Sequence, residues 1–161
     1  MLSTLALGAC GFHPLYSEET DAVDEPALAS VRVLPIANRL GQQLEFSLRE
    51  ALNPHGERAK TLYNLTTALQ QTHADLGIQR DASSTRGRVD VYATITLSDA
   101  RSSKVLYTGH VQSTSSYNIL TDGYAAQVAL DDAGTRTVRD LTTEIRTRLV
   151  LVLRNQRKKN A

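Results

Sequence analysis

Histidine and acidic side chains are the first candidates for catalysis or metal binding in this chain of 161 residues. None of the four histidines, at positions 13, 55, 73 and 110, belongs to a metal-ligand motif such as H-E-x-x-H. Asp131 and Asp132 are adjacent, and adjacent residues on a helix point about 100° apart, so they do not readily hold one ion. The sequence also lacks a G-x-S-x-G nucleophile motif and a phosphate-cradling glycine loop. We therefore expect no enzyme activity, no metal site and no cofactor.

The single cysteine, Cys10, follows Leu7, Gly8 and Ala9. This order of a branched apolar residue, two small residues and a cysteine resembles a bacterial lipobox, in which the thiol becomes a thioether that carries acyl chains. Residues 2–9 look like the end of an apolar signal segment. We therefore expect residues 1–9 to be a signal-peptide remnant and Cys10 to be lipidated, since several acyl chains anchor a domain stably. The alternative is a free cysteine near a frayed chain end.

Three arginines lie near one another in the middle of the sequence: Arg80, Arg86 and Arg88. They fall in an expected loop and at the start of an expected strand, so they would gather at one end of a hairpin. Guanidinium groups bind phosphates through paired hydrogen bonds, and such a cluster could hold a phosphorylated ligand. Asp81 and Asp90 offset part of this charge. The alternative is that the arginines only keep a turn soluble.

The net charge of +1 gives no strong field over the whole molecule, so we expect no nucleic-acid partner. The charge is nevertheless uneven. Residues 10–30 hold five acidic residues and no basic one, whereas residues 131–161 hold eight basic and four acidic residues. We expect residues 10–29 to be an acidic, lipid-anchored tether and residues 155–161 to be a basic tail. No apolar run approaches the roughly 18–20 residues that a membrane-spanning helix needs.

Hydrophobic periodicity predicts four strands and two helices in a single domain over residues 30–154. Alternating apolar residues indicate strands at 30–36, 63–70, 89–97 and 105–117. Asn38 is a plausible N-cap for a helix, and leucines at positions 40, 44, 48 and 52 give that helix one apolar face. A second, longer helix is expected from residue 121 to about residue 153.

This β-α-β-β-β-α order predicts an α+β fold, a two-layer sandwich in which two helices cover one face of a four-stranded sheet. The other face of the sheet should be polar but uncharged. Residues 149–153 are apolar all round, which a helix that covers one sheet face does not require. We leave two interpretations open: a strand-like or overpacked tail, or a contact with a partner.

The motifs along the chain resemble the LPS-assembly lipoprotein family of the LptE type, in its alphaproteobacterial form. The most specific is the entry Cys10-Gly11-Phe12-His13-Pro14-Leu15-Tyr16, which is similar to the family pattern C-G-F-x-P-L-Y. Looser matches continue along nearly the whole chain, at residues 36–48, 78–82, 116–118, 124–125 and 145–149.

This resemblance implies a lipoprotein anchored in the outer membrane and facing the periplasm. Members plug the outer-membrane β-barrel of the LPS translocon (LptD type), help the barrel to assemble and assist delivery of lipopolysaccharide to the outer leaflet; they are not enzymes. Gly11 is compatible with export to the outer membrane. Arg80 matches a hairpin position implicated in contacting lipopolysaccharide, to which we add Arg86 and Arg88 from their charge. The alternatives are an auxiliary lipoprotein of a lipid-trafficking ABC transport system and, with little support in the sequence, a periplasmic hydrolase.

Overall fold

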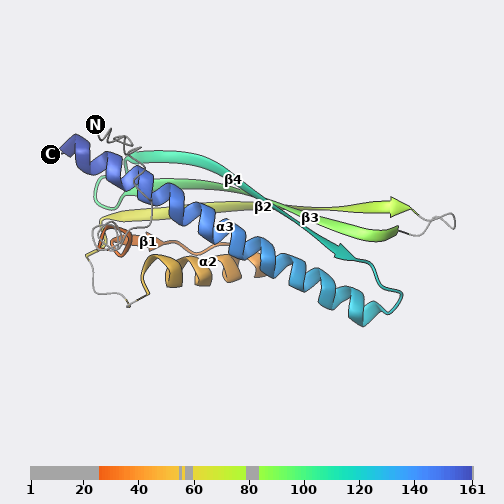
Figure 1. Cartoon of the computed structure of the whole chain (residues 1–161). Helices are drawn as coiled ribbons and strands as arrows, with labels where there is room; N and C mark the ends of the chain where they lie inside the picture. Colours follow the sequence, from red (N-terminus) through yellow and green to blue (C-terminus); the bar gives the residue numbers. More distant parts are fainter. Residues whose placement is uncertain (1–25, 55, 57–59, 79–83, 161) are drawn as a thin grey trace, which may run out of the picture.

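The computed structural model describes residues 26–54, 56, 60–78 and 84–160. Its elements follow the order β1 (Val31–Val33), α2 (Arg39–Leu52), β2 (Tyr63–Ile78), β3 (Ser84–Asp99), β4 (Val105–Asn118) and α3 (Gly123–Asn160). A short helical stretch at 26–28 precedes them. The four strands form one sheet in the order β1-β2-β3-β4, with β1 parallel to β2 and the other neighbours antiparallel. The helices α2 and α3 lie side by side against one face of this sheet (Figure 1). The predicted α+β sandwich is therefore confirmed.

The core lies between the helices and the inward face of the sheet. Alternate residues of β3 point into it, and Val89, Val91, Ile95 and Leu97 are fully buried. The leucines at 44, 48 and 52 supply the buried face of α2, as their four-residue spacing predicts. α3 contributes a third buried row: Leu141, Ile145 and Leu149.

The start of α2 shows how the sequence fixes the first crossover. The side chain of Asn38 accepts a hydrogen bond from Gly41 N at 2.9 Å, which confirms the predicted N-cap. Asn38 has a φ of 64° and a ψ of 170°, a backbone conformation that residues with a side chain rarely adopt. Gly41 is needed in the first turn because a Cβ there would lie 2.7 Å from Cγ2 of Ile36.

The hairpin of β2 and β3 is longer than the sequence predicts, since it adds residues 71–78 and 84–88 to the expected strands. Gln71, Thr72 and His73 are all exposed, so this part of β2 has no buried face and shows no alternation. The end of the hairpin at which β2 leads into β3 projects past the helices (Figure 1). The turn between β3 and β4 lies at the opposite end of the molecule, together with the C-terminus.

The helix α3 continues to Asn160, so residues 155–160 of the expected basic tail are helical. The apolar run at 149–153 is also helical, and the interpretation as a strand-like tail is wrong. Leu149, Val150 and Leu153 are buried, whereas Leu151 is 44% exposed. No helix in the described part of the chain has both the length and the apolar character needed to cross a membrane.

Candidate functional site

Two of the three predicted arginines lie on one face of β3, near the end of the hairpin at which β2 leads into β3. In the sheet register Arg86 is opposite Leu76 and Asn118, and Arg88 is opposite Ala74 and Ser116. Residues two apart on a strand share a face, which here is the face not covered by the helices. Arg80 and Cys10 lie outside the described residues. The structure thus brings Arg86 and Arg88 together on the open face.

Arg88 belongs to a polar cluster with Asp90 and Thr114. Arg88 Nε donates to Asp90 Oδ2 at 2.8 Å, and Thr114 Oγ1 donates to Asp90 Oδ1 at 2.7 Å. The hydrogen bond from Thr114 and the nearby Arg88 hold the pKa of Asp90 below its usual range, against the opposing effect of partial burial. The carboxylate therefore orients the Arg88 guanidinium, whose side chain is 42% exposed.

The remainder of the open sheet face is mostly hydroxyl and amide side chains. Thr94 Oγ1 and His110 Nδ1 lie 3.1 Å apart on neighbouring strands, and Tyr92 is exposed on the same face. This agrees with the predicted polar face. The expectation that the face carries no charge is wrong at the hairpin end, where Asp90 lies on this face. Its carboxylate can be partly buried there because Arg88 and Thr114 donate hydrogen bonds to it.

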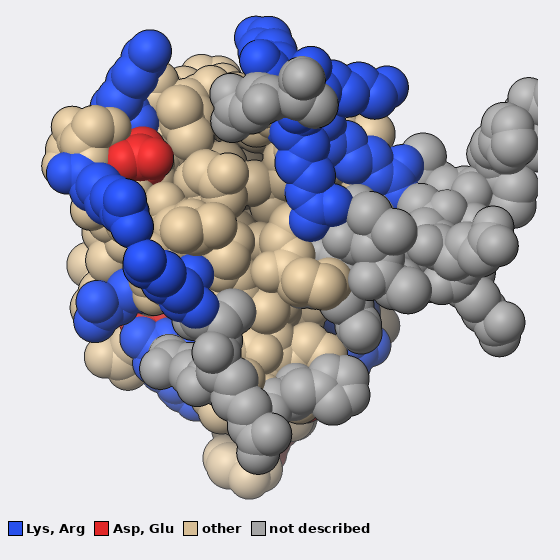
Figure 2. All heavy atoms as spheres, turned by 90° about the vertical axis from the view of Figure 1, so that its left-hand side faces the viewer, with Lys and Arg blue, Asp and Glu red and all other residues tan. Residues whose placement is uncertain are grey.

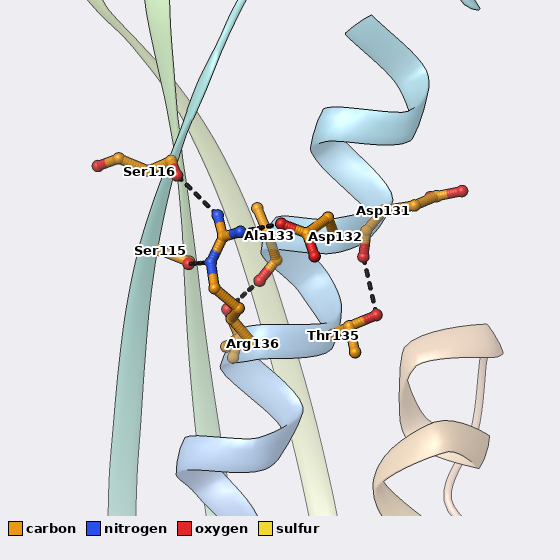
Figure 3. Close-up of polar contacts among 8 residues, drawn as sticks. Ser115, Ser116, Asp131, Asp132, Ala133, Thr135 and Arg136 are labelled. Carbon is orange, nitrogen blue, oxygen red and sulfur yellow. Dashed lines mark hydrogen bonds and ion pairs between the residues drawn. The ribbon is translucent and has the colours of Figure 1, made fainter. Parts of the chain in front are cut away.

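The free edge of β4 is covered by charged residues of α3 (Figure 3). Arg136 donates through Nε to Ser115 Oγ at 3.0 Å and through Nη2 to the carbonyl of Ser116 at 2.9 Å, and it pairs with Asp132. Three turns further along, Arg148 Nη1 donates to the carbonyl of His110 at 2.8 Å. Both arginines thereby satisfy carbonyls of a strand that has no neighbour on this side.

Asp131 and Asp132 contact arginines. Asp132 pairs with Arg136 of the next turn, and Asp131 lies 3.6 Å from Arg39 of α2. Among the described residues, no group of three or more histidine, cysteine or acidic side chains could hold a metal ion.

A groove of about 590 Å³ runs between α2 and α3 on the outer surface of the helical layer. Phe46 lies at this groove with 71% of its side chain exposed, beside Gln42, Val138 and Thr142. A single exposed phenylalanine is common on protein surfaces, but its place in a groove makes this surface a candidate contact for a partner. Sequence reasoning missed it because position 46 stands outside the leucine row of α2.

A basic end combines residues of the predicted basic tail with a turn that sequence reasoning did not associate with it. It consists of exposed side chains from the β3–β4 turn and from the last turn of α3: Arg101, Lys104, Arg157, Lys158 and Lys159. Figure 2 shows Lys and Arg side chains gathered around this end of the molecule. The two groups are more than 50 residues apart in the sequence, so only the fold reveals that they adjoin.

No protein-family model and no curated protein matches the chain. Solved structures do. The chain is similar to a Caulobacter crescentus protein described as a lipoprotein, with a TM-score of 0.68 and 21% identity, over 82% of this chain and 96% of that one. The chain has the fold of that protein. It is also similar to a minor lipoprotein from Acinetobacter baumannii, with a TM-score of 0.60 and 14% identity, over 76% of this chain and 92% of that one.

Proposed function

We propose that this chain is a lipoprotein of the outer membrane, anchored through Cys10 on the periplasmic side, and that it acts by binding rather than by catalysis. One observation carries the proposal: the chain shares its fold with two proteins described as bacterial lipoproteins over more than nine-tenths of their lengths. The lipobox-like residues before Cys10 supply the matching anchor.

Within this proposal the domain plugs the LPS-translocon barrel and helps it to assemble. The interior of a large outer-membrane barrel is polar, and the open sheet face offers hydroxyl and amide groups to such a wall. The groove beside Phe46 offers an apolar contact on the opposite, helical side. A plug needs both sides to be covered by its partner, and both sides of this domain carry suitable groups.

The hairpin end is proposed to contact lipopolysaccharide during its delivery to the outer leaflet. Arg86 and Arg88 share the open face there, and Arg80 falls between β2 and β3 in the sequence. Guanidinium groups suit the phosphates of lipid A and of the core sugars. The carboxylate of Asp90 holds one of these groups in a fixed position.

A pull-down from native membranes tests the plug role. The chain is expressed with its upstream codons and a C-terminal tag, solubilised in mild detergent and purified. We expect a large outer-membrane barrel in stoichiometric amount. An inner-membrane transporter subunit in place of the barrel would overturn the plug role and favour the auxiliary lipoprotein of an ABC transport system.

The anchor is tested separately with Cys10→Ser. We expect the parent chain to incorporate labelled palmitate and to fractionate with outer membranes. The variant should lose the label and become extractable without detergent. A parent chain that takes up no label would contradict lipidation, whatever the pull-down returns.

A further inference from the structure

The basic end, composed of Arg101, Lys104, Arg157, Lys158 and Lys159, has a charge that neither of its elements explains alone. From residue 145 to residue 160, α3 carries six basic residues and no acidic one. Basic residues at a helix C-terminus complement the helix dipole, so this run by itself has a structural explanation. The helix dipole does not explain Arg101 and Lys104, which lie at the same end of the molecule but belong to the turn between β3 and β4.

Asp99 is the acidic side chain of this turn, and the turn itself binds it. Its Oδ1 accepts hydrogen bonds from Ser102 N at 2.7 Å and from Arg101 N at 3.0 Å. These bonds hold the pKa of Asp99 below its usual range. The carboxylate thus fixes the backbone of the turn, while the side chains of Arg101 and Lys104 are exposed to solvent.

Apolar side chains are exposed beside these charges. Val105, the first residue of β4, is 56% exposed, and Leu62, just before β2, is 43% exposed. In Figure 2 basic side chains lie on two sides of an area of neutral residues. Basic groups around exposed aliphatic groups are the pattern by which peripheral proteins contact anionic lipid surfaces.

The expected tether joins the domain at this end. The carbonyl of Ser30 accepts hydrogen bonds from Leu62 N and Tyr63 N, and the carbonyl of Leu62 accepts one from Ala100 N in the β3–β4 turn. The chain that follows the tether therefore enters the sheet next to the turn that carries Arg101. An acyl anchor at Cys10 would thus be joined to the domain at this end, through the tether of residues 10–29.

We propose that the basic end docks on the anionic phospholipids of the membrane in which the chain is anchored, on the periplasmic leaflet. The β2–β3 hairpin of the domain then points away from that leaflet. This orientation rests on the proposed anchor at Cys10, whereas the affinity for anionic lipid does not. The occupant is phospholipid because the charge, the aliphatic groups and the entry of the tether coincide at one end.

Vesicle co-sedimentation of the full chain with Cys10→Ser tests the affinity without the anchor. We compare vesicles of phosphatidylcholine alone with an equal mixture of phosphatidylcholine and phosphatidylglycerol. The chain should bind only the anionic vesicles, and added salt should release it. Two paired variants, R101Q/K104Q and K158Q/K159Q, should each lower binding roughly 25-fold, at about fivefold for each lost charge.

The matched control is R39Q/R139Q, which removes the same charge from exposed positions at the α2–α3 groove and should bind almost as well as the parent. Equal losses in all three pairs would show a response to net charge only and would overturn the docking surface. No binding to anionic vesicles would also overturn it, while palmitate labelling of the parent would still report on the anchor. If the basic-end pairs lost barrel co-purification but kept vesicle binding, this end would be a protein contact and the proposal would be wrong.

Discussion

Tyr117 of β4 covers Gly87 of β3, its direct partner in the sheet register. A Cβ at Gly87 would overlap the tyrosine ring, so glycine is the residue that lets the ring lie on the strand backbone. An aromatic residue opposite a glycine restores the packing that the missing side chain would have provided. Gly87 lies between Arg86 and Arg88, so the tyrosine ring packs on the strand that carries these two arginines.

Gly87→Ala should therefore destabilise the domain, by about 1–3 kcal/mol, because the ring must move away from the strand. Urea unfolding followed by circular dichroism measures this change. Gly123→Ala is the matched control, since a Cβ there meets nothing within 4 Å. It should be neutral or slightly stabilising. Equal stability of the two variants would show that a Cβ at position 87 does not displace the Tyr117 ring.

Arg136→Lys should cost about 1 kcal/mol, although it preserves the charge. The guanidinium reaches Ser115, Ser116 and Asp132 at once, and an ammonium on a flexible stem cannot reproduce that fork. Arg39→Lys is the control, because the pair of Arg39 with Asp131 is 3.6 Å long and exposed on both sides. Its effect should be close to zero in the same unfolding experiment. A harmless Arg136→Lys would mean that the free edge of β4 does not need this contact.

The sequence was sufficient to predict the elements that face the core. Burial imposes a period of two on β3 and a spacing of four on α2, and both patterns are visible from the identities of residues such as Val91 and Leu48. The N-cap at Asn38 was predictable for a different reason, because its side chain bonds a backbone group three residues away. Such local chemistry needs no knowledge of the tertiary fold.

The remaining features depend on tertiary contacts that leave no periodic pattern. Gln71, Thr72 and His73 of β2 are all exposed, so the extension of this strand could not be predicted from hydrophobicity. The basic end joins residues near 101 and 158, and the groove beside Phe46 needs the placement of α3. Of the predicted site residues, Arg86 and Arg88 could be located on one face, whereas Arg80 and Cys10 fall outside the described residues.

Acidification should remove part of the stability that Asp90 provides. Its pKa is lower in the folded chain than in the unfolded one, so its contribution is fully present above about pH 4 and is lost as the pH falls through the folded value. Asp90→Asn should therefore flatten the dependence of the unfolding free energy on pH below about pH 4. Urea titrations across this range measure the slope. Glu50→Gln, at an exposed position, should keep the slope of the parent.

Arg80→Glu should weaken the binding of purified lipopolysaccharide about tenfold or more, because a charge-assisted contact is replaced by repulsion. Arg86→Glu should act in the same direction. Arg139→Glu makes the same charge change at an exposed position on α3 and should leave binding nearly unchanged. Circular dichroism and the urea midpoint check that each variant is folded. Unchanged binding by Arg80→Glu would remove the hairpin end from the proposed contact.

Phe46→Ser separates a partner-binding role of the α2–α3 groove from a structural one. The side chain is 71% exposed, so its removal should change the unfolding free energy by less than about 0.5 kcal/mol. If the groove contacts the barrel, the same variant should recover much less barrel in the pull-down.

Leu48→Ala, two positions along the same helix, is the contrasting control. Leu48 is fully buried, and this change should cost about 2–5 kcal/mol. A Phe46→Ser chain that recovers as much barrel as the parent would exclude the groove as the apolar contact, and Leu151 on α3 would be the next residue to test.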